Sequence, residues 1–220
     1  MKIIVIEGTD CSGKETQSIL LEEKLKEAGY SCARYSFPVY ESPSGKIVGG
    51  AYLGKDEISK SYFTEGAVNV DARVASLYYA ADRLYNIDKM IDENLDFIIL
   101  DRYVSSNMAH QGSKLENPRE RLALYRWLEK LEYDLLKLPQ ADITFFLHMP
   151  YEKAAELKKN RDTSDEHERS EKHLRQAESA YLELAELYDW SSIKCVVNDE
   201  IRTKEDIAEE VFSLIKKRKS

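Results

Sequence analysis

Cysteines and histidines are few in this sequence, and neither set has the spacing of a structural or catalytic site. Three cysteines, Cys11, Cys32 and Cys195, occur in 220 residues, an odd and widely spaced set that indicates neither a disulfide framework nor a zinc site. The four histidines show no metal-ligand spacing. A domain of this length buries about 70% of its unfolded surface, so it needs neither disulfides nor a metal to fold. We therefore expect a reducing, cytoplasmic compartment.

The sequence also lacks a long hydrophobic run. Its first apolar run, residues 3–6, ends at Glu7 and is too short for the core of a signal peptide. The mean hydropathy is −0.52 and 33% of the residues are charged, which excludes a membrane-embedded protein. We expect no export signal and no membrane partner.

An excess of positive charge is missing as well. Lys and Arg total 32 against 40 Asp and Glu, which gives a net charge of −8. Nonspecific binding to the phosphate backbone of nucleic acids relies on a strong excess of Lys and Arg. We therefore expect no nucleic acid partner, and a small anionic ligand would need positive charges gathered in one pocket.

Short β-branched runs alternate with stretches of helical periodicity along the whole chain, which predicts a single domain over residues 1–220. This alternation predicts an α/β fold, a five-stranded parallel sheet covered by helices on both faces, with ligands at the carboxyl ends of the strands. Residues 37–54 are expected to form a loop with a broken helix, and polar residues 160–170 either a solvated connection or a mobile lid. The expected strands are 2–7, 31–36, 97–101, 143–149 and 193–197, and the expected helices are 14–28, 71–94, 118–136, 151–159, 171–188 and 203–217.

A glycine-rich loop, residues 8–16, directly follows the first expected strand. Its glycines let successive N–H groups point inward, Lys14 can reach the β- and γ-phosphates of a nucleotide, and the next helix adds partial positive charge. A buried strand, a glycine-rich turn and a helix are the context that this motif requires. The predicted phosphate-binding residues are Gly8, Thr9, Asp10, Cys11, Ser12, Gly13, Lys14, Glu15 and Thr16.

The position after Lys14 departs from the usual motif, which places Ser or Thr there to reach Mg²⁺. Glu15 occupies that position and Thr16 follows it. Either Thr16 contributes to the metal site or Glu15 approaches the ion, although a carboxylate in a helix's first turn also complements the helix dipole. Asp101, at the end of the third expected strand, is a further candidate for organising Mg²⁺ and its water.

The stretch 101–112, which begins Asp-Arg-Tyr, resembles the thymidylate kinases, the nucleoside monophosphate kinases that phosphorylate dTMP. The Phe-Pro pair at 37–38, the helix at 77–83 and the segment 181–185 match that family in the same order, as does the glycine-rich loop. The resemblance runs from the first strand to the last helix, so it is more specific than any single motif.

This resemblance implies a P-loop kinase fold, ATP as the phosphoryl donor, Mg²⁺ as the cofactor and a homodimer. The implied reaction is the phosphorylation of dTMP to dTDP, with Lys14 and Arg102 in catalytic positions. The acceptor-binding region would span about residues 37–83, and the lid about residues 160–170.

Tyr79 and Arg83 lie four residues apart on one expected helix, so a ring and a guanidinium can face the same base. By resemblance, Asn107 and Gln111 would lie near the base edge and Tyr103 near the sugar. Alternatively, residues 77, 78, 81 and 85 form a core stripe with Tyr79 at its margin. The remaining acceptor residues implied by the resemblance are Asp10 at the 3′-hydroxyl, Phe37 and Pro38 as walls, and Arg102 at the phosphate.

Two positions depart from the family pattern. Tyr40 stands where the family has an arginine that grips the acceptor phosphate, so Arg102 would need help, with Lys46 or Arg34 as candidates. In the lid, Glu166 replaces an expected arginine, and the predicted catalytic cations are Arg161 and Arg169, with Arg175 further along. A cation there matters because arginine fingers contribute about 10³ to 10⁵ in rate in other phosphoryl transfer enzymes.

Three other functions stay open on the sequence. The first is the same enzyme with a different acceptor, such as dUMP or a deoxynucleoside. The second is a catalytically weakened P-loop protein that mainly binds nucleotides, suggested by the departures from the family pattern. The third is a GTP-dependent switch, for which residues 203–206 are only a weak match to a guanine-reading segment.

Overall fold

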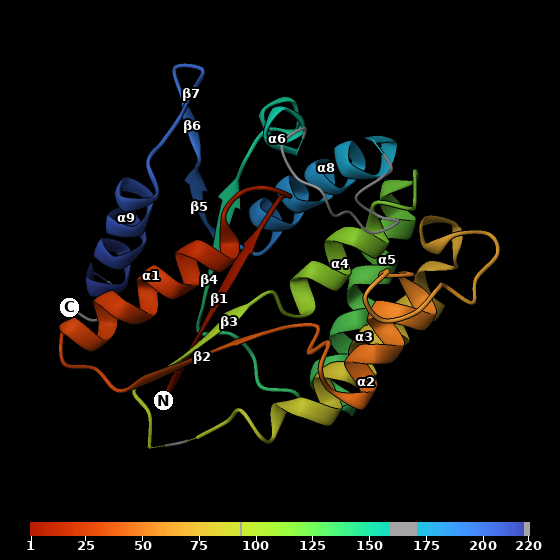
Figure 1. Ribbon diagram of the computed structural model, residues 1–220, viewed down its shortest axis with the longest axis horizontal. Coiled ribbons are helices and arrows are strands. Elements are labelled where there is room, and N and C mark those ends of the chain that lie inside the picture. The colour runs from red at the N-terminus through yellow and green to blue at the C-terminus, as the bar shows by residue number, and fades with distance from the viewer. Residues whose placement is uncertain (93, 159–170, 218–220) are drawn as a thin grey trace.

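The computed structural model describes residues 1–92, 94–158 and 171–217. Five strands form one parallel sheet, as expected from the sequence, and their order is β2-β3-β1-β4-β5 (Figure 1). The strands are β1 (Lys2–Gly8), β2 (Cys32–Ser36), β3 (Phe97–Asp101), β4 (Ile143–His148) and β5 (Ser191–Lys194).

Helices cover both faces of the sheet. The α-helices are α1 (Lys14–Glu27), α2 (Pro43–Lys46), α3 (Ala72–Ile87), α4 (Val104–Gly112), α5 (Pro118–Glu129), α6 (Tyr151–Lys158), α8 (Glu171–Leu187) and α9 (Lys204–Lys217). Two π-helical turns, η1 (Ile47–Tyr52) and η3 (Lys130–Leu135), and a 3₁₀ turn, η2 (Ala67–Asn69), add to these helices, and two short strands, β6 (Val196–Val197) and β7 (Glu200–Ile201), form a separate antiparallel pair. Among the described residues, no helix is long and apolar enough to cross a bilayer.

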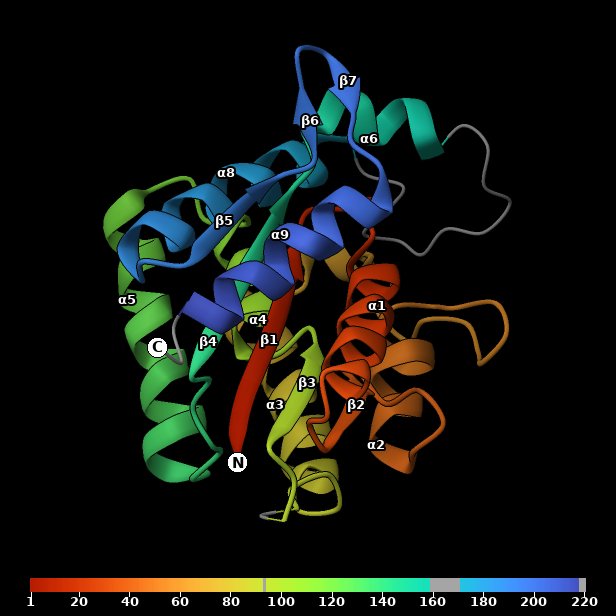
Figure 2. The ribbon, with the colours of Figure 1, turned by 90° about the vertical axis from the view of Figure 1, so that its left-hand side faces the viewer.

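The central strand β1 is buried on both faces because its residues alternate between two hydrophobic cores. Ile4 and Ile6 pack with the side chains of α1 and α9, whereas Ile3 and Val5 pack with those of α4, α5 and α8. Figures 1 and 2 show α1 and α9 on one side of the sheet and α4, α5 and α8 on the other. This arrangement explains why the strand reads as an unbroken apolar run.

A third, smaller core is formed by the segment that follows β2 and by the start of α3. Val48, Tyr52 and Leu53 from η1 and its end pack there against Val70 and the start of α3. The loop with a broken helix expected at 37–54 is thus a short α-helix followed by a π turn. The Nζ of Lys114, beyond α4, donates to the carbonyl oxygens of Ala67 and Val70, each at 2.9 Å, and ties this segment to the main body.

Several expected boundaries are wrong. The fifth strand runs over 191–194 instead of 193–197, because the chain leaves the sheet at Cys195 and residues 196–197 pair antiparallel with 200–201. Helix α3 ends at Ile87 rather than near residue 94. The stretch after Arg102, for which no helix was expected, forms α4.

Candidate active site

The carboxyl ends of β1, β3 and β4 meet at one edge of the sheet and carry the glycine-rich loop and the Asp-Arg pair. Ile6 of β1 is in register with Asp101 of β3, and Gly8 with Leu147 of β4. A Cβ atom at Gly8 would lie only 2.6 Å from the carbonyl oxygen of Leu147, so the loop can leave the sheet here only without a side chain. The loop is thus held against the neighbouring strand.

The glycine-rich loop curls around the side chain of Lys14. The Lys14 Nζ donates to the carbonyl oxygens of Gly8 at 3.1 Å and Thr9 at 2.8 Å. Gly13, with φ of +79°, supplies the left-handed turn into α1. Burial, helped by the nearby charge of Arg102, lowers the pKa of Lys14 to about 8. A phosphate group would replace the two carbonyl contacts and stabilise the ammonium.

Asp101 is a buried carboxylate at the end of β3, and its Oδ1 has no hydrogen-bond partner. Burial raises the pKa of this carboxyl, whereas the charges of Arg102 and Lys14 lower it. Glu15 and Thr16 are exposed on the first turn of α1. Among the described residues, no three His, Cys, Asp or Glu side chains converge in a way that could hold a metal ion.

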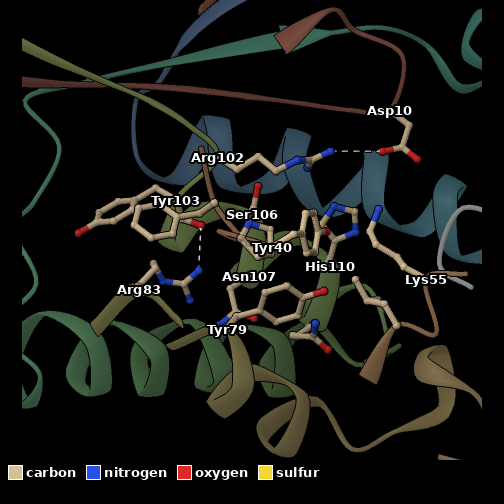
Figure 3. Close-up of a pocket in the computed structure, with 14 residues that line it drawn as sticks. Asp10, Tyr40, Lys55, Tyr79, Arg83, Arg102, Tyr103, Ser106, Asn107 and His110 are labelled. Carbon is tan, nitrogen blue, oxygen red and sulfur yellow. Dashed lines mark hydrogen bonds and ion pairs between the residues drawn. The ribbon is translucent and has the colours of Figure 1, made fainter. Parts of the chain in front are cut away.

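A cavity of about 240 Å³ opens beside this loop, between α3, α4 and the segment after β2 (Figure 3). It gathers side chains that are far apart in the sequence. All nine acceptor-binding residues expected from the sequence line it, namely Asp10, Phe37, Pro38, Tyr79, Arg83, Arg102, Tyr103, Asn107 and Gln111. The other lining residues are Tyr40, Leu53, Lys55, Ser106 and His110.

One end of the cavity, which we call the amide end, is lined by Tyr79, Arg83, Asn107 and Gln111. Both polar atoms of the fully buried Gln111 side chain and the Oδ1 of Asn107 lack a hydrogen-bond partner. The Arg83 guanidinium is paired with Glu132, a buried carboxylate of η3 that sequence reasoning missed. Buried amides without partners are rare in folded proteins, so these point to a ligand with hydrogen-bonding groups.

The other end, which we call the cation end, carries Arg102 and Lys55. An Arg102 Nη2 lies 3.9 Å from the Oδ1 of Asp10, and the Lys55 Nζ lies 4.6 Å from the centre of the Tyr40 ring. In Figure 3 the Lys55 side chain extends toward Asp10, on the side of the cavity that Arg102 occupies. Two cations at one end of a cavity with amides at the other suit a ligand with an anionic group.

Neither of the residues proposed from the sequence to help Arg102 belongs to the lining. Lys46 is exposed on α2, and the Arg34 Nε lies 3.6 Å from an oxygen of Glu22. Lys55 was missed because no spacing or motif marks it. Its place depends on the π turn η1 that precedes it.

The chain matches the thymidylate kinase family model over residues 6–210. The chain belongs to the thymidylate kinase family. It is 31% identical to a probable thymidylate kinase of Thermococcus kodakarensis, covering 84% of each chain. It is 30% identical to the thymidylate kinase of Prochlorococcus marinus, covering 98% of this chain and 96% of the relative. The solved structure of Candida albicans thymidylate kinase has the same fold, with a TM-score of 0.75 at 23% identity over 99% of this chain and 92% of that one.

These matches confirm the family resemblance, the P-loop kinase fold and the enzyme class that were expected from the sequence. Thymidylate kinases are kinases that phosphorylate dTMP with ATP as donor, so the family accounts for a phosphate loop beside a cavity with a cation end. The roles of individual residues remain predictions. Two of them, Arg161 and Arg169, lie outside the described residues, together with the expected lid at about 160–170.

Glu7 holds the two halves of this thymidylate kinase site together. It is the last residue but one of β1, and its Oε1 accepts from the backbone N–H groups of Tyr103 at 2.9 Å and Ser106 at 3.0 Å. Its Oε2 accepts from the Ser106 hydroxyl at 2.6 Å and the Tyr181 hydroxyl at 3.1 Å. Burial raises the pKa of Glu7, and these hydrogen bonds and Arg102 oppose that rise. Glu7 thereby caps the N-terminus of α4, the helix that carries the amide end.

Proposed function

We propose that this thymidylate kinase transfers the γ-phosphoryl group of ATP to dTMP bound in the cavity, giving dTDP. The observation that carries the proposal is the pairing of unpartnered buried amides at one end with Arg102 and Lys55 at the other, beside the phosphate loop. A nucleoside monophosphate has this combination of a hydrogen-bonding base and a phosphate. Each polar contact in such a site is stronger because water is excluded from it.

The base of dTMP would lie at the amide end. Tyr79 and Arg83 are on one face of α3, so the ring can stack on the base while the guanidinium meets its edge. Asn107 and Gln111 offer the unpartnered polar atoms that a base edge needs. Tyr103, with its ring 5.9 Å from that of Phe37, walls the space between the ends, where the sugar would lie.

The phosphate of dTMP would lie at the cation end. Arg102 contributes a planar fork suited to phosphate. Lys55 adds a second charge, and among the described residues no carboxylate lies within ion-pairing distance of its Nζ. Asp10, whose Oδ1 lies 3.9 Å from the Arg102 Nη2, would accept a hydrogen bond from the sugar 3′-hydroxyl. Lys55 therefore takes the role that the sequence left without a residue at Tyr40.

The donor phosphates would bind the loop 8–16, with Lys14 at the β- and γ-phosphates. Asp101, with its unpartnered buried Oδ1, and Thr16 or Glu15 would hold Mg²⁺, which would supply positive charge beside the donor phosphates. Arg161 or Arg169 would supply the lid cation. The protein's own contribution is to position two phosphates and to stabilise the charge that develops between them.

We also propose that the enzyme is a homodimer and that it works in the cytoplasm. One face of α3 exposes Val74, Leu77, Leu84 and Tyr85, all more than 40% accessible. The sequence allowed a core stripe through positions 77 and 85, and the structure turns both outward. A contiguous apolar helix face is typical of a subunit contact. Sedimentation at several concentrations tests it, and a purely monomeric protein would contradict it.

A coupled assay of ATP consumption against nucleosides and monophosphates, with and without Mg²⁺, tests the function. We expect turnover that needs both dTMP and Mg²⁺. Hydrolysis of GTP without an acceptor would support the switch instead. No turnover with any acceptor would overturn the kinase proposal. If one lid arginine supplies the catalytic cation, we expect a severe loss of turnover in only one of the variants Arg161→Ala and Arg169→Ala.

A further inference from the structure

Glu132 contacts two residues of the amide end without lining the cavity itself. Its Oε2 accepts from the Arg83 Nε and its Oε1 from the Arg83 Nη2, both at 2.5 Å. The same Oε1 accepts from the Asn107 Nδ2 at 3.2 Å. Glu132 is fully buried, so no water competes for its oxygens. One carboxylate behind the cavity therefore fixes two neighbouring side chains in front of it.

The surroundings of Asn107 leave its amide only one orientation. Its Nδ2 lies 3.2 Å from the Glu132 Oε1 and 3.2 Å from the carbonyl oxygen of Ser76. A carboxylate and a carbonyl accept hydrogen bonds and never donate them, so the atom that meets both must be the amide nitrogen. The Oδ1 of Asn107 is then directed away from them, buried and without a partner. Asn107 thus has an acceptor to offer a ligand.

The same carboxylate decides what Arg83 can offer. Two of the guanidinium nitrogens are engaged by Glu132, which leaves the Nη1 group. The Nη1 has only a long contact of 3.5 Å with the carbonyl oxygen of Tyr103. Arginine donates hydrogen bonds and accepts none. The amide end therefore presents a donor from Arg83 beside an acceptor from Asn107.

We infer that Glu132 is a positioning residue that sets the hydrogen-bond polarity of the amide end and thereby selects the acceptor base. A donor beside an acceptor matches a pyrimidine edge with a carbonyl next to a ring N–H, as in thymine and uracil. Cytosine presents an amino group next to an unprotonated ring nitrogen, the reverse pattern. The inference rests on the proposed function, because it assigns the base to the amide end.

The local fold explains how a charged residue reaches this buried place. The π turn η3 follows α5 directly, and its wider turn shifts the side chains that face inward. Glu132 points into the protein, whereas its neighbour Asp134 is exposed. The sequence predicted a helix over 118–136, and a continuous α-helical spacing gave no sign of the π turn.

Glu132→Gln tests this inference in a comparison of dTMP with dCMP as acceptors. Because Arg83 and Asn107 donate to both oxygens of Glu132, the new NH₂ group must face an N–H donor whichever way it turns, and the two side chains lose the carboxylate that fixes their orientation. We expect the ratio of kcat/KM for dTMP to kcat/KM for dCMP to fall at least about tenfold. The loss should lie mainly in KM for dTMP. A merely structural role would slow both nucleotides equally and leave the ratio unchanged, which would overturn the inference.

Asn107→Leu keeps the inference testable should Glu132→Gln fail to fold, since it leaves the Arg83–Glu132 pair intact. It removes the acceptor and should lower the same ratio by a similar factor, and an unchanged ratio would again overturn the inference. Glu120→Gln, the same change at an exposed position of α5, is the control and should leave the ratio as it is. Failure of the unaltered enzyme to phosphorylate dTMP would instead overturn the proposed function.

Discussion

The amide end and the cation end of the cavity are built in opposite ways. The residues of the amide end belong to helices α3 and α4, and their one charged group, Arg83, is already neutralised by Glu132 of η3. The cation end stands on loops, where Arg102 has a positive φ of 66° and Lys55 rests on an aromatic ring. The groups of the amide end are thus fixed in advance by a buried partner, whereas Arg102 at the cation end has a long contact of 3.9 Å with Asp10.

The largest effect should come from Lys14→Met at the donor loop. The substitution removes the ammonium that meets the donor phosphates, and we expect kcat/KM to fall by about 10³ or more. In the free protein Lys14 bonds only backbone carbonyls, so the melting temperature should change little. Lys26→Met, at an exposed position of the same helix, is the matched control. Near-normal steady-state kinetics of Lys14→Met would remove the loop from catalysis.

Substitutions of Glu7, which links β1 to the N-terminus of α4, should lower stability to an extent that depends on hydrogen-bond direction. Glu7→Leu leaves the buried N–H groups of Tyr103 and Ser106 without an acceptor, and should cost about 3 kcal/mol of unfolding free energy. Glu7→Gln keeps an oxygen for those N–H groups, and the Ser106 and Tyr181 hydroxyls can turn to accept from its NH₂. It should cost less than about 1 kcal/mol.

Urea unfolding of the two Glu7 variants measures this difference. Equal losses for leucine and glutamine would mean that the Glu7 charge, and not the capping of α4, matters for stability.

Lys55→Met should affect the cation end alone. Without the second cation beside Arg102, the acceptor phosphate is held less tightly, and we expect KM for dTMP to rise about tenfold with kcat changed only a few-fold. Lys46→Met is the matched control, because Lys46 is exposed and outside the cavity. If Lys46→Met had the larger effect on KM, the assignment of Lys55 would be wrong.

The smallest effect concerns Lys114, which anchors the wall that carries Lys55. Burial lowers its pKa to about 8, against about 10.4 in an unfolded chain. Between these values the unfolded state binds more protons, so the contribution of Lys114 to stability rises with pH. The stability of Lys114→Met relative to the natural protein should therefore fall from pH 8 to pH 10. Urea unfolding across this range would contradict the assignment if the difference stayed constant, as it should for exposed Lys60→Met.

Sequence alone predicted what depends on local pattern. The strand β1, the loop around Lys14 and the parallel sheet follow from periodicity and glycine spacing. The nine expected acceptor residues share one cavity because strand ends and the two helices α3 and α4 bring them together. Lys55 and Glu132 both depend on π turns, which shift side chains out of α-helical spacing, and no sequence pattern marks them. The chain leaves β5 at Cys195 although two valines follow, so the end of this strand predicted from β-propensity alone was wrong.

The most direct test of the account is a competition between equal concentrations of dTMP and dCMP for phosphorylation by the unaltered enzyme with Mg²⁺ and ATP. Chromatography of the products gives the initial rates of dTDP and dCDP formation in one sample. The donor and acceptor groups of the amide end predict that dTDP forms at least about tenfold faster than dCDP. Equal rates for the two products would contradict the account.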